Sequence, residues 1–144
     1  MSWRSLAQDL CHDVVLGSPL GADALRAAET ALGRDLPLVL ALLLSDCDGI
    51  QHEYGTDVIW STKRLQEENL RLRSDQSLGD LYAGHGEVLF IGDNGWDDRF
   101  ALVADGSVFA WVAETGEWVF AAPDLEAYVR IAMRDEGDWY RTGG

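Results

Sequence analysis

Few side chains in this sequence of 144 residues have the types and spacing needed for catalysis. A covalent mechanism needs a nucleophile beside a base, and a cysteine with a histidine is one such pair. Cys47 follows the most apolar segment of the chain, where a cysteine more often packs as a small hydrophobic side chain. We therefore expect a non-catalytic protein with reduced cysteines. The alternative is a hydrolase that uses Cys47 with one of the three histidines, His12, His52 or His85.

Metal-binding motifs are incomplete. His85 and Glu87 have the H-x-E spacing of zinc deaminases, but both cysteines lie upstream and the required downstream pair is missing. His52-Glu53 lacks the second histidine of a zinc protease motif. The acidic segment 93–98 lacks the third- and twelfth-position ligands of a calcium-binding EF-hand loop. We expect neither a metal ion nor a cofactor.

Two acidic turns and one tryptophan are the remaining candidates for a functional site. Trp96 lies within the acidic turn 93–98, and tryptophan is enriched among the residues that dominate binding energy at interfaces. The alternative is that its ring folds back over the edge of the sheet. We predict partner contacts from the turns at 46–48 and 93–98, through Asp46, Asp48, Asp93, Trp96, Asp97 and Asp98.

The charge balance restricts the class of partner. The chain has 25 acidic and 11 basic residues, for a formal charge of −14, while 47% of its residues are hydrophobic. A disordered chain would combine high charge with low hydrophobicity, so this one should fold. Nucleic acids and anionic membranes would repel it, because binding to them depends on Lys and Arg. A basic protein is the better candidate.

The sequence favours a cytoplasmic location. The longest apolar run, residues 36–44, is less than half of the roughly 20 residues that span a bilayer. The N-terminus has neither the basic start nor the uninterrupted apolar block of a signal peptide.

Three helices are predicted in the first third of the chain. Apolar residues three or four apart give the first helix one apolar stripe and carry it to about residues 17–19: Trp3, Leu6, Leu10 and Val14. A second helix covers about 23–32 and is stopped by Gly33. A third, buried helix covers 37–45, with Pro37 in its first turn.

The middle of the chain changes pattern. Short strands are predicted at 50–54 and 57–60. Ser61 should then cap a polar helix that runs to about Arg73, and the glycines that follow indicate a loop over 74–87.

The last third predicts an antiparallel meander and a helix. Glycine-containing turns separate four β-prone runs, at 88–91, 100–103, 108–112 and 118–120. An amphipathic helix capped by Asp124 should follow. The tail 135–144 is expected to fray, or alternatively to place Trp139-Tyr140 back against the domain. The fold class is α+β, an antiparallel meander sheet flanked by N-terminal helices and a C-terminal helix, in one domain over 1–144.

Several short segments of the chain form a recognisable pattern when their order and spacing are considered together. Residues 29–37 carry E-x-x-L-G-x-x-L-P, and Asp48-Gly49 follows. The hairpins add further matches: 89–95, Phe100, Gly106, 108–111 and Glu114. Over about residues 20–130 this pattern resembles the SUKH superfamily, which contains the yeast cell-wall assembly regulator and many bacterial toxin-immunity proteins. The chain departs from the family pattern at 95–98 and 111–114.

The resemblance implies a sheet flanked by helices and a protein-binding domain without catalysis. In bacteria it implies an immunity protein that binds and neutralises a toxin, often a nuclease. Because nucleases present basic surfaces to phosphates, an acidic inhibitor suits such a partner. The alternative is a regulatory or scaffold module that binds an endogenous protein. The partner's identity, the oligomeric state and the binding face of the sheet stay open at the level of sequence.

Overall fold

The computed structural model describes residues 2–52, 55–74, 88–134 and 139–141. Within them, seven strands form two antiparallel sheets. The smaller sheet has the order β1 (Val15–Leu16), β2 (Ile50–Gln51), β3 (Asp57–Ile59). The larger is a meander of β4 (Val88–Asp93), β5 (Arg99–Val103), β6 (Val108–Val112) and β7 (Glu117–Ala122). The predicted α+β class and meander are confirmed.

The two sheets meet where β3 lies beside β4. The Trp60 N–H donates to the Ile91 carbonyl at 2.7 Å, just beyond the end of β3. Gly92 allows this close approach, because a Cβ there would collide with the Val58 carbonyl. The Tyr128 hydroxyl donates to that same carbonyl at 2.6 Å, so a helix also fixes the junction.

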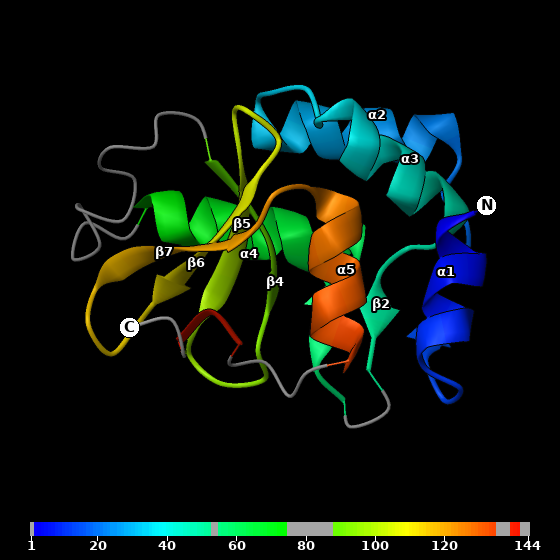
Figure 1. Cartoon of the computed structure of the whole chain (residues 1–144). Coiled ribbons are helices and arrows are strands. Elements are labelled where there is room, and N and C mark those ends of the chain that lie inside the picture. Colours follow the sequence, from blue (N-terminus) through cyan, green and yellow to red (C-terminus); the bar gives the residue numbers. More distant parts are fainter. Residues whose placement is uncertain (1, 53–54, 75–87, 135–138, 142–144) are drawn as a thin grey trace.

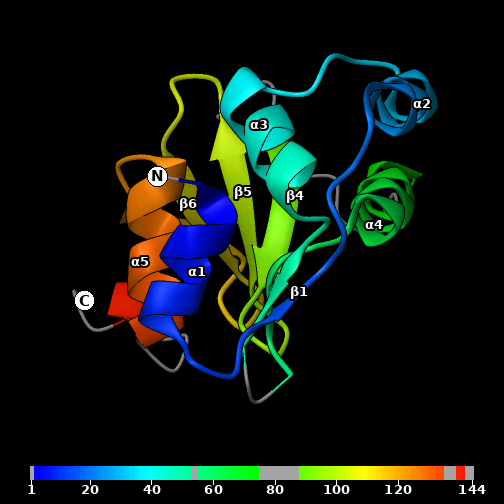
Figure 2. The same cartoon turned by 90° about the vertical axis from the view of Figure 1, so that its right-hand side faces the viewer.

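Five α-helices surround the sheets in the described residues: α1 (Trp3–Leu10), α2 (Ala22–Leu32), α3 (Leu38–Asp46), α4 (Thr62–Ser74) and α5 (Leu125–Arg134). Helices α1 and α5 lie together on one side of the sheets, and α2 and α4 lie on the other (Figures 1 and 2). Asn69 fixes α4 to β4, because its side chain donates to the Phe90 carbonyl at 2.8 Å and accepts the Phe90 N–H at 2.9 Å.

Several local signals act as predicted. Gly33 adopts a φ of 72° and ends α2 in the left-handed region that glycine tolerates best. The Ser61 hydroxyl accepts the Arg64 N–H at 3.3 Å at the start of α4. The Asp124 carboxylate accepts the Ala127 N–H at 2.8 Å at the start of α5. Capping and turn chemistry thus determine these boundaries.

Several predicted boundaries are wrong. The first helix ends at Leu10, and Val14 lies outside it. Val15 and Leu16 instead pair with β2, because the extended chain finds a strand partner that helical periodicity does not reveal. The predicted strand at 50–54 is also too long, because β2 ends at Gln51. Residues 53–54 of that strand and 75–87 of the predicted loop lie outside the described residues.

The third predicted helix exists but is not buried on all sides. Leu40, Leu43 and Leu44 are fully buried, whereas Leu38 and Leu42 are 74% and 55% exposed. Pro37 precedes the helix rather than lying within its first turn. The apolar run therefore predicts the helix correctly but not its environment, since no polar side marks which face meets solvent.

The C-terminal segment folds back in the part that the structure describes. Residues Trp139–Arg141 form the 3₁₀ turn η2. The Trp139 ring stacks on Phe100 with centroids 5.3 Å apart, and the Tyr140 ring meets Phe100 edge-on at 5.2 Å. Of the two alternatives for this pair of aromatics, the folded-back one is observed; residues 135–138 and 142–144 lie outside the described residues.

Candidate functional site

The turn between β4 and β5, residues 93–98, is closed by its own side chains. An Asp93 carboxylate oxygen accepts the Gly95 N–H at 2.7 Å, and the Asn94 side-chain oxygen accepts the Trp96 N–H at 2.9 Å. Gly95 has a φ of 84°, which favours glycine, and Thr56 lies close against it. Such Asx turns are a standard use of Asp and Asn side chains, so the local sequence explains the shape of the tip.

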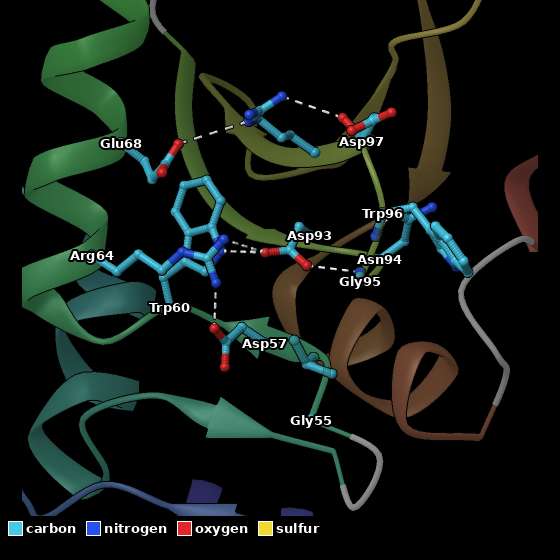
Figure 3. A network of polar contacts seen from close by, with 12 residues as sticks. Gly55, Asp57, Trp60, Arg64, Glu68, Asp93, Asn94, Gly95, Trp96 and Asp97 are labelled. Atoms are coloured by element: carbon cyan, nitrogen blue, oxygen red, sulfur yellow. Dashed lines mark hydrogen bonds and ion pairs between the residues drawn. The ribbon is translucent and has the colours of Figure 1, made fainter.

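Asp93 ties the first side of this turn to β3 and α4. It is 8% exposed, and its second oxygen accepts the Trp60 indole N–H at 2.8 Å. The same oxygen lies 2.9 Å from the Arg64 guanidinium, which also pairs with Asp57 and stacks over the Trp60 ring (Figure 3). The Asp93 carboxylate is therefore bonded within the protein, and it shares the Arg64 cation with Asp57.

Asp98 ties the other side of the turn to β6 and the C-terminal segment. It is 1% exposed, and one oxygen accepts the Ala113 N–H at 3.1 Å. The other accepts the Tyr140 hydroxyl and lies 2.6 Å from the Arg141 guanidinium. The Asn94 amide donates to the Tyr140 hydroxyl at 3.1 Å, which joins both sides of the turn. Burial and the bond to Asp98 raise the pKa of Tyr140 well above its ordinary value.

Trp96 projects from this network into solvent. Its side chain is 84% exposed, and Figure 3 shows the indole directed away from the contacts that hold the turn. Asp97 beside it is also exposed. Of the two alternatives for the tryptophan, the ring folded over the sheet edge is not the one observed.

The six predicted contact residues therefore divide into two groups. Asp93, Trp96, Asp97 and Asp98 share one turn, but Asp93 and Asp98 are buried and their carboxylates have internal partners. Asp46 accepts the Trp3 N–H at 2.7 Å at the start of α1. Asp48 accepts the Thr62 N–H at 2.7 Å at the start of α4. Both hold helix N-termini, where a carboxylate is favourable, so Trp96 and Asp97 stay as the predicted contacts.

Two acids that were not among the predicted contacts lie at the same end of the larger sheet. Glu114 lies in the β6–β7 turn and Glu117 begins β7, and the Asp98–Ala113 bond joins this turn to the β4–β5 turn. Both are exposed, and the Glu114 carboxylate is 3.9 Å from the Arg141 guanidinium. We call Trp96, Asp97, Glu114 and Glu117 the turn face. The sequence marked Glu114 only as part of the family pattern, and it marked Glu117 only by its position beside a turn, which many other residues share.

Nucleophilic chemistry at Cys47 is not supported. The residue is fully buried, and desolvation raises the pKa of its thiol to about 11. A catalytic cysteine needs the opposite shift, because the thiolate is the nucleophile.

Among the described residues, no three His, Cys, Asp or Glu side chains gather in a way that could hold a metal ion. None of the helices described is long and apolar enough to cross a membrane.

Comparison with known proteins supplies one finding. Residues 19–131 match the model of the SMI1/KNR4 family (SUKH-1). A search of curated protein sequences returned no match. The matched range contains the whole β4–β5 turn but ends before Tyr140 and Arg141, so part of the support for Trp96 comes from outside it.

Proposed function

The chain belongs to the SMI1/KNR4 (SUKH-1) family, which includes immunity proteins, and on this basis we propose that it is a non-catalytic immunity protein. Its role would be to bind and neutralise a basic toxin, such as a nuclease, in the cytoplasm. The turn face would make the central contact.

The observation that carries this proposal is Trp96, which is 84% exposed on a turn held from both sides. Buried Asp93 and Asp98 bind five partners outside the turn: Trp60, Arg64, Ala113, Tyr140 and Arg141. A turn fixed in this way loses little conformational entropy on binding, so more of the contact energy appears as affinity. Large aromatic side chains of this kind dominate many interfaces.

Charge would guide the approach of a basic partner. The exposed acids of the turn face are Asp97, Glu114 and Glu117, and the whole chain carries a formal charge of −14. Charges of this kind mainly accelerate association and suppress wrong partners, with a smaller effect on dissociation. Salt should therefore slow binding by screening the charges.

The experiment is co-expression with a candidate toxin from the same gene neighbourhood, together with measurement of binding between the two purified proteins. We expect Trp96→Ala to abolish protection and to raise Kd at least about thirtyfold, as for an aromatic residue at the centre of an interface. Because Trp96 is exposed, this change should leave thermal unfolding almost unchanged.

Phe120→Ala is the matched control, because Phe120 is another exposed aromatic residue, 54% exposed on β7. It should protect as well as the natural sequence. Asp97→Asn with Glu114→Gln should slow association and flatten its dependence on salt. Full protection by Trp96→Ala, or no binding to the neighbouring toxin, would contradict the proposal.

A further inference from the structure

Helix α3 carries an apolar surface that has no role in the proposed toxin contact. Leu38 and Leu42 lie one helical turn apart and are 74% and 55% exposed. The opposite side of the helix is filled by Leu40, Leu43 and Leu44, which are completely buried. A helix that is apolar all round is normally buried all round, so its exposed side indicates a binding surface.

A groove adjoins these leucines. It has a volume of about 340 Å³ and lies between the α2–α3 connection and the β5–β6 turn. Its apolar walls come from both sides: Leu36, Pro37, Val39, Leu102 and Val103. The exposed leucines and this groove form one continuous region through Val39, which is itself 37% exposed. We call Leu38, Leu42 and the groove the α3 face.

The α3 face has a net negative charge, because two acids, Asp35 and Asp105, lie there with one base, Arg34. The Arg34 guanidinium donates to the Asp35 and Val88 carbonyls at 3.3 and 3.5 Å, so it is directed to the backbone. Asp35 lines the groove with an exposed side chain. Asp105 is exposed between the groove residues Ala104 and Gly106. Hydrogen bonds from the Ser107 hydroxyl and N–H lower the pKa of Asp105, which keeps it charged.

We propose that the α3 face binds an amphipathic helix of a partner protein, one with basic residues beside its apolar stripe. Two leucines at i and i+4 next to an apolar groove suit helix-in-groove recognition, in which apolar anchors enter the groove. The carboxylates of Asp35 and Asp105 would pair with the basic residues. A second copy of this chain is a poor occupant, because each copy carries a formal charge of −14.

The α3 face and the turn face lie at opposite ends of β5. Asp97 lies two residues before this strand and Ala104 immediately follows it, and a strand of five residues is about 16 Å long. Figure 1 shows α3 and the β4–β5 turn at opposite ends of the molecule. The chain can therefore hold two partners at once, as a scaffold module would, and the α3 face does not depend on the toxin contact.

The test uses a fluorescein-labelled synthetic helix of about 18 residues, built from Leu and Lys with one apolar stripe. A Leu–Glu helix of the same pattern and a scrambled Leu–Lys peptide are its references. We expect the Leu–Lys helix to bind the full chain and Leu38→Ser with Leu42→Ser to weaken it at least about tenfold. Asp35→Asn with Asp105→Asn should weaken it about threefold.

The matched control is Val15→Ser with Phe120→Ser, which removes two exposed apolar side chains elsewhere and should leave affinity unchanged. Trp96→Ala should also leave it unchanged, which separates this surface from the turn face. NMR shifts on binding should centre on Val39 and Leu102. Equal binding of the scrambled peptide, an unchanged affinity in the Leu38/Leu42 variant, or shifts centred on Trp96 would overturn the proposal. A dimer that the Leu38/Leu42 variant abolishes would overturn it too, by making a second copy the occupant.

Discussion

The turn face and the α3 face expose large side chains by opposite physical means. Trp96 is held out by polar contacts between residues far apart in the chain, from 15 positions for Asp98 and Ala113 to 46 for Asn94 and Tyr140. Leu38 and Leu42 are exposed by local helix geometry, because α3 already buries its other side. The exposure of Trp96 on the turn face depends on a tertiary network, whereas the exposure of the leucines on the α3 face depends only on the docking of one helix.

This difference predicts how each surface fails. A single substitution among the partners of Asp93 or Asp98 should alter the turn face without touching Trp96 itself. The α3 face should change only when its own leucines or the packing beneath them change. The following variants test that contrast, beginning with the largest expected effect.

Removal of the Asp98 carboxylate should have the largest effect on stability. Asp98→Ala removes the shared acceptor of Ala113, Tyr140 and Arg141 and leaves the buried Tyr140 hydroxyl unsatisfied, so we expect a loss of about 3–5 kcal/mol in the free energy of unfolding. Urea unfolding measures it. The control is Asp97→Ala at the exposed neighbour, with an effect within about 0.5 kcal/mol. Equal effects at the two positions would show that the network does not hold the turn.

The two sides of α3 should respond very differently to the same substitution. Leu40→Ala creates a cavity at a fully buried position and should cost about 3 kcal/mol. Leu42→Ala, two positions along the same helix, should change stability by less than about 0.5 kcal/mol, because the side chain is 55% exposed. Thermal unfolding of both variants gives the comparison. A large loss in Leu42→Ala would mean that the exposed leucines support the fold rather than a partner.

Loss of the Tyr140 hydroxyl should loosen the turn without unfolding the domain. Tyr140→Phe removes one hydrogen bond to Asp98 and one from Asn94, at a cost of about 1–2 kcal/mol. Hydrogen exchange should become faster at the Trp96 N–H, which is bonded to Asn94, and should stay unchanged in α3. Arg130→Gln, in an exposed ion pair on α5, serves as the control. Uniformly faster exchange across the domain would contradict a local role.

The smallest expected effect concerns high pH. The pKa of the Cys47 thiol is about 11 in the folded chain against 9.0 as its ordinary value. Above pH 9 the unfolded chain releases this proton first, so ionisation favours unfolding and stability falls as pH rises toward 11. The pKa values of buried Tyr128 and Tyr140 are also raised, so their ionisation lowers the stability of the folded chain further above pH 10.

Cys47→Ala isolates the contribution of the thiol. Between pH 9 and 10 its stability should decline less than that of the natural sequence, although its stability at neutral pH will be lower or equal. Urea unfolding across this pH range measures the difference in slope. Identical slopes would mean that Cys47 titrates normally, which would reopen the question of a reactive thiol.

Much of the fold follows from local patterns. Gly33, Ser61 and Asp124 mark helix boundaries because capping depends on residues a few positions apart. The glycine turns set the meander because hairpin geometry is equally local. The end of the first helix was missed because the pairing of Val15 with Gln51 joins residues far apart in sequence.

The candidate site followed from the sequence only in part. The turn and its tryptophan were identifiable, since both are contiguous. The network that holds them was not, because Arg64, Tyr140 and Arg141 carry no motif that directs them to Asp93 or Asp98. The two acidic turns suggested five carboxylates as contacts, yet the sequence cannot distinguish a carboxylate that faces solvent from one that accepts a buried hydrogen bond.

The sequence by itself determined most of the elements, the excess of negative charge and the family pattern, because these depend on neighbouring residues and on sums over the chain. Tertiary structure alone decided that Asp93 and Asp98 face inward while Trp96 and Asp97 face outward. It also decided which side of an entirely apolar helix would stay in solvent. The physical reason is the same in both cases: burial is set by what packs against a side chain, and those partners come from distant parts of the chain.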